Sequence, residues 1–194
     1  MIRRKIIVFI LVSLTTNIVI QGQNTSSIPD KEKLEIALDY FSSAKYREAL
    51  TLLTKLDKKY KLNPRFRAYI GVCHYYEWNY KEACSYLDET INDIEVYAPH
   101  ERSIYYFTDA ESHFFLKEYE KAVPLYEKML NVCFNNEKGD AFFRLGFCYI
   151  QMNKNEAALE SLKSALLYYE KFGYGNDKKA RVVQIKKMIE GLKK

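Results

Sequence analysis

Glycine and proline are both scarce in this sequence, with only 7 Gly and 4 Pro among 194 residues. Low-complexity disordered chains and turn-rich β folds contain more of these two residue types, so both classes are disfavoured. Hydrophobic residues make up 48% of the chain, which is enough to build a continuous core. The length and composition therefore favour one helical domain or a short repeat array.

Recognisable catalytic and metal-binding motifs are also missing. The chain has no CxxC pair, no HExxH motif, no EF-hand loop and no glycine-rich phosphate loop. Its acidic residues are scattered, and no two of them are placed by their spacing for acid–base chemistry. Two of its three histidines, His74 and His113, fall at a packing position of the repeat described below. We therefore expect no enzyme activity, no bound metal and no other cofactor.

The net charge of +5 comes from the two ends of the chain rather than from its body. Residues 1–23 carry three bases and no acid, and residues 177–194 carry seven bases and two acids. A nucleic-acid-binding protein needs a basic face on its folded unit, and the body of this chain is slightly acidic. We expect no nucleic acid partner, and the basic C-terminal segment is interpreted as a solvated helix face.

The first 22 residues have the layout of a secretory signal peptide. Three basic residues precede an apolar stretch at residues 6–20, and the small residue Gly22 follows it. This stretch is shorter than the roughly 20 apolar residues of a membrane-spanning helix. We expect cleavage near Gly22, a short linker at residues 23–29, and export to the periplasm or cell envelope. The alternative is an uncleaved segment that anchors the protein in a membrane.

The four cysteines are compatible with export, because disulfides can form outside the cytoplasm. They are Cys73, Cys84, Cys133 and Cys148. Cys73 and Cys84 are equally distant from a turn near Trp78 and would be level on two antiparallel helices. The sequence does not show whether their side chains face each other. Buried free thiols are the default expectation, and a Cys73–Cys84 bridge is the alternative.

A four-fold internal repeat decides the fold class. Each copy contains a short segment that begins at Tyr46, Tyr80, Tyr119 or Asn155 and ends three residues later in alanine. Twelve residues before each alanine stands a small residue, namely Ala37, Gly71, Ala110 or Gly146. Nine residues before it stands Tyr40, His74, His113 or Tyr149. Small residues let two helices approach closely, so each copy should be a helix–turn–helix unit.

This pattern resembles the tetratricopeptide repeat, W-x2-L-G-x2-Y followed by A-x3-F, over about residues 30–172. The last copy fits best, and the third departs from the pattern at Asp109, where leucine is expected. The resemblance implies an all-α fold, a right-handed superhelical α-solenoid of helix–turn–helix repeats with a C-terminal capping helix. We expect repeats at about residues 30–63, 64–98, 99–138 and 139–172.

The basic segment at residues 177–194 is the predicted capping helix. Solenoids need a terminal helix with a polar outer face to cover the last repeat. Lysines occupy much of this segment, and its apolar stripe is predicted to consist of Ala180, Val183, Ile189 and Leu192.

Aromatic residues are abundant, with 17 Tyr and 11 Phe. In the tetratricopeptide family, the first helix of each repeat lines a concave groove. Helical spacing from the small crossing residue predicts a partner-binding set there, consisting of Tyr69, Tyr75, Tyr76, Phe107, Glu111, Phe114, Phe115, Phe143, Arg144 and Phe147. Aromatic anchors of this kind dock a peptide or helix of another protein. Stripes at helical spacing are also typical of a core, so part of this set has a packing explanation.

The resemblance implies a non-catalytic protein-binding adaptor or assembly factor of the cell envelope. Its partner would be a protein or peptide held in the concave groove. One alternative is a membrane-tethered structural subunit of a larger envelope complex, which requires that the N-terminal segment be retained. The other alternative is a protein that binds a small molecule or a glycan on the aromatic groove.

Overall fold

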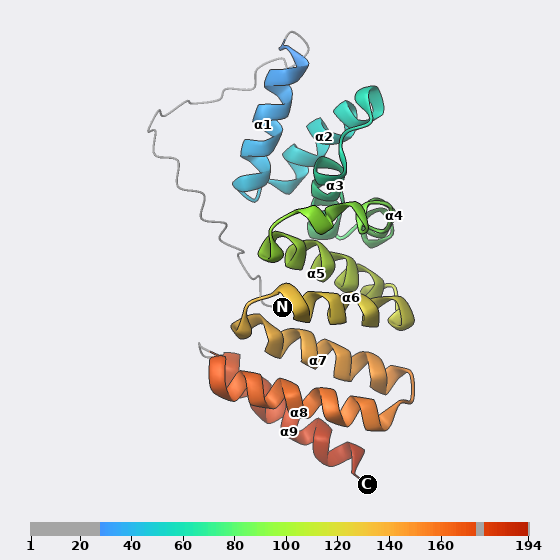
Figure 1. Cartoon of the computed structure of the whole chain (residues 1–194), viewed down its shortest axis with the longest axis vertical. Coiled ribbons are helices and arrows are strands. Elements are labelled where there is room, and N and C mark those ends of the chain that lie inside the picture. Colours follow the sequence, from blue (N-terminus) through green and yellow to red (C-terminus); the bar gives the residue numbers. More distant parts are fainter. Residues whose placement is uncertain (1–27, 174–176, 194) are drawn as a thin grey trace.

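The computed structural model describes residues 28–173 and 177–193, and within them the chain forms helices and no β-strand (Figure 1). The predicted signal peptide and the linker up to residue 27 lie outside these described residues, so both stay predictions. Among the described helices, none is both long and apolar enough to cross a membrane. The α-helices are α1 (Asp30–Ser42), α2 (Tyr46–Tyr60), α3 (Pro64–Tyr76), α4 (Tyr80–Thr90), α5 (Pro99–Phe115), α6 (Tyr119–Val132), α7 (Asn135–Gln151), α8 (Asn155–Phe172) and α9 (Asp177–Leu192).

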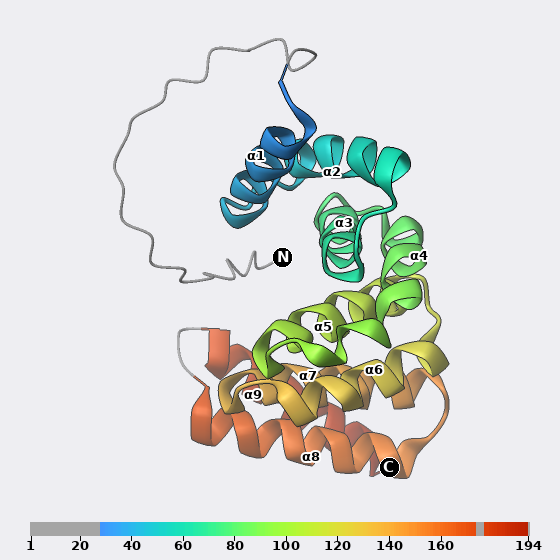
Figure 2. The same cartoon turned by 45° about the horizontal axis from the view of Figure 1, so that its top comes forward.

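Consecutive helices form hairpins that stack in chain order. α1 packs on α2, α3 on α4, α5 on α6 and α7 on α8, and each hairpin also contacts the next one. Figure 1 shows the stack from α1 at the top to α9 at the bottom, and Figure 2 shows it after a turn of 45°. The structure confirms the predicted all-α solenoid. The fourth hairpin begins at Asn135, four residues before the boundary predicted at residue 139.

Each hairpin turns through one residue with a left-handed backbone. The four residues are Ala44, Trp78, Lys117 and Asn153. Their φ angles lie between 57° and 66°. Such angles are uncommon outside glycine, yet they recur at the same place in every hairpin. The amide of the next residue then donates a hydrogen bond to the carbonyl of Tyr40, His74, His113 or Tyr149. The recurrent tyrosine-or-histidine position of the repeat therefore helps to close the turn through its backbone.

The small residue of each repeat lies where the two helices of a hairpin cross. A Cβ atom added to Gly71 would stand 2.6 Å from Cγ of Leu87, and one added to Gly146 would stand 2.7 Å from Cγ of Leu162. Both separations are shorter than a carbon–carbon contact allows. The other two hairpins have alanines at this position, and both are fully buried. Close packing therefore explains the small residue that the sequence pattern repeats.

The connection between α4 and α5 is the longest between two hairpins within residues 28–173. It contains the short 3-10 helix η2 (Asp93–Val96), and Ile94 of this helix is fully buried in the core shared by α3 to α7. α5 then begins at Pro99, where the missing amide proton leaves no hydrogen bond unmade. The extra length of this connection therefore adds a packed element rather than a loose loop.

Helix α9 covers the last hairpin. Ile185 and Ile189 are buried in one cluster with Phe143 of α7. The predicted apolar stripe is wrong at Ala180, which is exposed, and at Val183, which is 52% exposed. Ile185 lies one helical turn before Ile189 and so shares its face, whereas Val183 lies six residues before Ile189 and points elsewhere.

Candidate functional site

Rings from all four hairpins form a continuous series, which we call the aromatic row. Neighbouring rings in this series have centroids between 4.1 and 6.4 Å apart. The aromatic row consists of Phe41, Tyr46, Tyr69, Tyr75, Tyr76, Tyr80, Phe107, Phe114, Phe115, Tyr119 and Phe147.

The closest ring contacts of the row join one repeat to the next. Tyr46 of α2 stacks on Tyr76 of α3 with centroids 4.1 Å apart, and Phe115 of α5 stacks on Tyr80 of α4 at 4.6 Å. Further along, Phe114 of α5 lies 5.4 Å from the ring of Phe147. Aromatic pairs contribute about 0.5–1.5 kcal/mol beyond their buried area. The row therefore helps to hold the repeats together as well as presenting rings to solvent.

Exposure separates the row from the true core. Its members are half-buried, except Phe115, which is 46% exposed. Half-buried rings show an edge or a face to solvent while their other side packs against the protein. Phe115 is the most accessible ring of the row, and the rings of Tyr80 and Phe114 hold it at 4.6 and 5.9 Å.

An ion pair with a buried carboxylate lies beside the rings of the row on α5 and α7, and its arginine side chain is 28% exposed. The guanidinium of Arg144 (α7) donates to both carboxylate oxygens of Glu111 (α5), with Nε–Oε1 and Nη2–Oε2 distances of 2.6 and 2.7 Å. The hydroxyl of Tyr126 (α6) donates to the same carboxylate at 2.5 Å. Arg144 also lies over the ring of Phe114, 4.4 Å from its centroid. The pair therefore connects the third and fourth repeats and fixes one ring of the row.

Two tyrosine hydroxyls of the row, those of Tyr75 and Tyr76, stay protonated at neutral pH. Burial raises the pKa of Tyr75 and of Tyr76 well above the usual tyrosine value. Burial, together with the carboxylate of Glu111, raises the pKa of Tyr126 as well. The row is consequently uncharged apart from the neighbouring ion pair. It offers apolar rings and a few hydroxyl groups that can donate or accept hydrogen bonds.

Most of the predicted partner-binding residues lie together in the structure. The predicted rings on α3 and α5, and Phe147 on α7, are all members of the row. Arg144 lies against them, but Glu111 has a side chain only 3% exposed, so it binds Arg144 rather than presenting itself to a partner.

The prediction for Phe143 is wrong. This ring is 5% exposed and belongs to the core beneath the capping helix, where the guanidinium of Arg181 lies 4.2 Å from its centroid. Helical spacing alone assigned it to the groove, because the sequence did not show which face of α7 the capping helix would cover.

Sequence reasoning missed the tyrosines at the start of the second helices. Tyr46, Tyr80 and Tyr119 begin α2, α4 and α6, and each joins the row. They had already appeared as the first residue of the repeated turn segment. That recurrence was the available signal, and only the path of the chain shows that these rings turn back toward the first helices.

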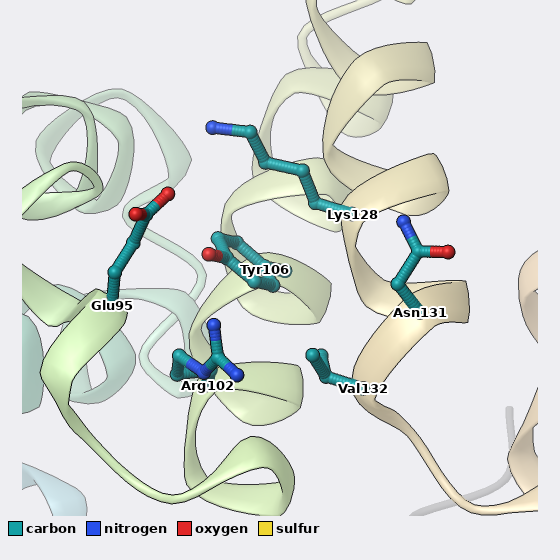
Figure 3. A pocket seen from close by; sticks show the side chains of 6 residues that line it. All are labelled: Glu95, Arg102, Tyr106, Lys128, Asn131 and Val132. Atoms are coloured by element: carbon teal, nitrogen blue, oxygen red, sulfur yellow. The ribbon is translucent and has the colours of Figure 1, made fainter.

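A separate pocket lies between α5 and α6. Its volume is about 180 Å³, and Figure 3 shows the residues that line it, namely Glu95, Arg102, Tyr106, Lys128, Asn131 and Val132. None of them belongs to the aromatic row. Sites for drug-sized ligands are typically about 300–1,000 Å³, so this pocket is too small for most organic ligands.

All four cysteines have free thiols, three of them buried and Cys133 half-buried. The structure therefore agrees with the default expectation and contains no Cys73–Cys84 bridge. Burial raises the pKa of Cys73 far above its usual range, as expected for an unreactive thiol inside a core.

The stacked hairpins and their recurrent turns define a class of protein, the helical repeat solenoid. Within this class, a family model of the tetratricopeptide repeat matches residues 140–171, the copy that fits the sequence pattern best. This segment of the chain is therefore a tetratricopeptide repeat. No curated protein matches the sequence of the chain.

Several solved structures share this fold at low sequence identity. The structure titled MamA 41-end from Desulfovibrio magneticus RS-1 is 16% identical, with a TM-score of 0.58 over 84% of this chain and 92% of that chain. MamA AMB-1 is 15% identical, with a TM-score of 0.60 over 84% of this chain and 93% of that chain. At this identity the likeness shows the fold alone.

Proposed function

We propose that the chain is a non-catalytic adaptor that binds a segment of another protein on the aromatic row. Tetratricopeptide solenoids present extended surfaces built from successive repeats, and binding of other proteins is the usual role of such surfaces. The observation that supports the proposal is the continuity of partly exposed rings across all four repeats. The expected ligand is a peptide or helix whose apolar side chains meet successive rings.

Phe115 is the best place to test this binding. A photoreactive phenylalanine analogue at position 115 of the full chain should cross-link one protein in intact cells. The same analogue at position 78 is the matched control, because Trp78 is 64% exposed and lies outside the row. Once the partner is identified, Phe115→Ala should weaken its binding by about 30-fold, the size of a hot-spot contact. Trp78→Ala should leave the affinity unchanged.

The proposal fails if position 115 gives no more cross-linking than position 78, or if Phe115→Ala leaves the affinity intact. Stabilisation of the chain by a sugar or another small molecule, without any cross-link, would support a small-molecule site on the row instead. Thermal unfolding of each variant verifies that loss of binding does not come from loss of the fold.

We also propose that the protein is exported and acts in the cell envelope as an assembly factor. This part rests on residues 1–22, with their basic start and short apolar stretch. N-terminal sequencing of the protein from the envelope fraction should find a start near Gln23. An intact Met1 start would instead support a membrane-tethered subunit.

A further inference from the structure

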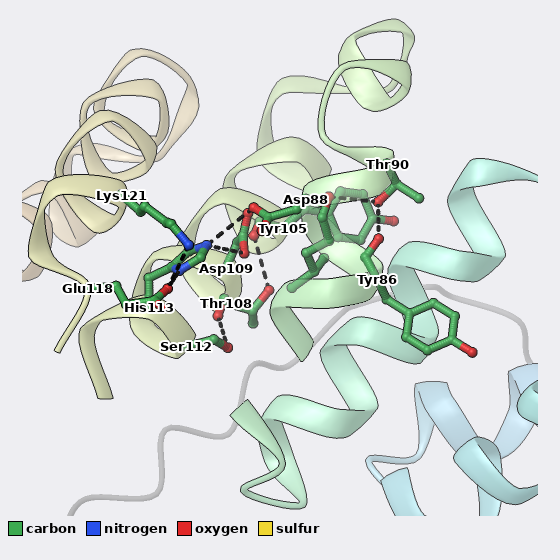
Figure 4. A network of polar contacts seen from close by, with 11 residues as sticks. Tyr86, Asp88, Thr90, Tyr105, Thr108, Asp109, Ser112, His113, Glu118 and Lys121 are labelled. Carbon is green, nitrogen blue, oxygen red and sulfur yellow. Dashed lines mark hydrogen bonds and ion pairs between the residues drawn. The ribbon is translucent and has the colours of Figure 1, made fainter. Parts of the chain in front are cut away.

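A cluster of metal-ligating side chains lies between the second and third repeats, apart from the aromatic row. Cys84 and Asp88 stand four residues apart on α4, and Asp109 and His113 stand four residues apart on α5. Residues four apart share one face of a helix, and these two faces meet where α4 packs on α5. Figure 4 shows Asp88, Asp109 and His113 converging there.

Asp109 is the anomalous member of the cluster. It is fully buried, and neither of its carboxylate oxygens has a hydrogen-bond partner among the described residues. Its nearest basic group is Nε2 of His113, at 3.6 Å. A carboxylate without partners is costly to bury unless a cation is present. The third repeat has this residue where the repeat pattern expects leucine, so packing does not explain it.

His113 is held so that one ring nitrogen points into the cluster. Its Nδ1 lies 2.7 Å from Glu118, which also accepts a hydrogen bond from Lys121 at 3.1 Å. Because the Glu118 oxygen that Nδ1 contacts already accepts from the Lys121 ammonium, it acts as an acceptor and Nδ1 is the donor. Nε2 then faces Asp88 at 3.2 Å and Asp109 at 3.6 Å. A carboxylate that fixes the outer nitrogen is the usual support of a metal-binding histidine.

We propose that Cys84, Asp109 and His113, together with Asp88, form a binding site for one zinc ion. The ligand atoms of the first three residues all lie within 4.8 Å of one another. Thiolate, imidazole and carboxylate are the ligands that zinc accepts in a four-coordinate site. Asp88 supplies the route for the ion, because its side chain is 52% exposed while the other three residues are buried. The site departs from the expectation, based on sequence, that His113 serves packing alone.

The zinc ion would tie two repeats together. Its ligands come in equal number from α4 and α5, on either side of the connection that carries η2. In a solenoid each repeat contacts only its neighbours, so a link at one junction strengthens the coupling between the two halves of the array. Binding to the folded state alone should therefore raise the unfolding temperature.

Zinc titration of the full chain tests the site. The protein is stripped with a chelator under reducing conditions and then given Zn²⁺ or Co²⁺. We expect one zinc per chain, a thiolate-to-cobalt charge-transfer band, and a rise in Tm of about 5–10 °C at zinc a hundredfold above Kd. Glu118→Gln should weaken zinc binding by about 10- to 100-fold, because it removes the charged support of His113.

Two further variants make the result decisive. Asp109→Leu restores the residue that the repeat pattern expects, so it should fold and yet lose zinc binding and the cobalt band. Cys133→Ser is the matched control for adventitious thiol binding, because this cysteine lies outside the cluster, and it should bind zinc like the wild type. Absence of zinc uptake by the wild type, or full uptake by Asp109→Leu, would overturn the proposal.

Discussion

Replacing Arg144 by methionine should destabilise the protein strongly, because it leaves a buried carboxylate without its cation. Glu111 has a side chain only 3% exposed, and its partners are Arg144 at 2.6 and 2.7 Å and Tyr126 at 2.5 Å. In Arg144→Met the carboxylate keeps only the tyrosine hydroxyl. Methionine preserves most of the aliphatic packing of the arginine, so the variant isolates the loss of charge.

The expected size follows from this burial. Removing one partner of an ion pair while the other charge stays buried lowers the free energy of unfolding by about 3–5 kcal/mol. In a chain of this length that loss corresponds to a fall in Tm of roughly 6–20 °C. A surface ion pair would contribute only about 0–1 kcal/mol, so the two cases are easily separated.

Urea unfolding of the full chain, followed by far-ultraviolet circular dichroism, measures the change as a shift in midpoint at constant m-value. A triple variant, Glu111→Leu with Arg144→Met and Tyr126→Phe, is the control, because it removes every polar group of the cluster together. Apolar replacement of a whole buried ion pair is neutral or stabilising, so the triple variant should recover the stability that the single variant lost. A single-variant cost below about 1 kcal/mol, or a triple variant as unstable as the single one, would refute this reasoning.

Three smaller predictions follow from burial, capping and thiol state. Phe143→Ala should lower the free energy of unfolding by about 3–5 kcal/mol, because it truncates a core ring, whereas Phe115→Ala should lower it much less, because Phe115 is 46% exposed. Equal losses for the two variants in urea unfolding would contradict the placement of Phe143 in the core and Phe115 at the surface. Asn63→Ala should lower the free energy of unfolding by about 0.5–2 kcal/mol, because the Asn63 side chain caps α3 by accepting a hydrogen bond from the Phe66 amide at 3.1 Å. Asn79→Ala is the control, because the Asn79 side chain makes no capping hydrogen bond. Thiol titration of the denatured chain without reductant should find four reactive groups, and two would indicate a disulfide.

The repeat pattern was sufficient to predict the helices and their order. Periodic small residues and the recurrent turn segment are local signals, because each depends on contacts within one hairpin. Gly71 and Gly146 illustrate this, since each packs against the second helix of its own hairpin. The left-handed turns escaped prediction because Ala44, Trp78 and Lys117 are not residue types that normally favour such a backbone.

The candidate site was only partly predictable. Rings on the first helices could be placed by helical spacing, and those on α3 and α5 do join the aromatic row. Phe143 could not be separated from them, because its burial depends on Ile185 and Arg181 of a helix more than thirty residues away in the sequence. The zinc cluster was hidden for the same reason, because its two residue pairs lie on different repeats.

The sequence by itself determined the fold class, since helix–turn–helix repeats are specified by short-range spacing that each copy carries independently. The tertiary structure alone decided which rings stay accessible and which charges become buried. Exposure depends on how each hairpin docks on the next and on where α9 folds back, and these contacts join residues from different repeats. The aromatic row, the Glu111–Arg144 pair and the cluster around Asp109 all arise at such junctions.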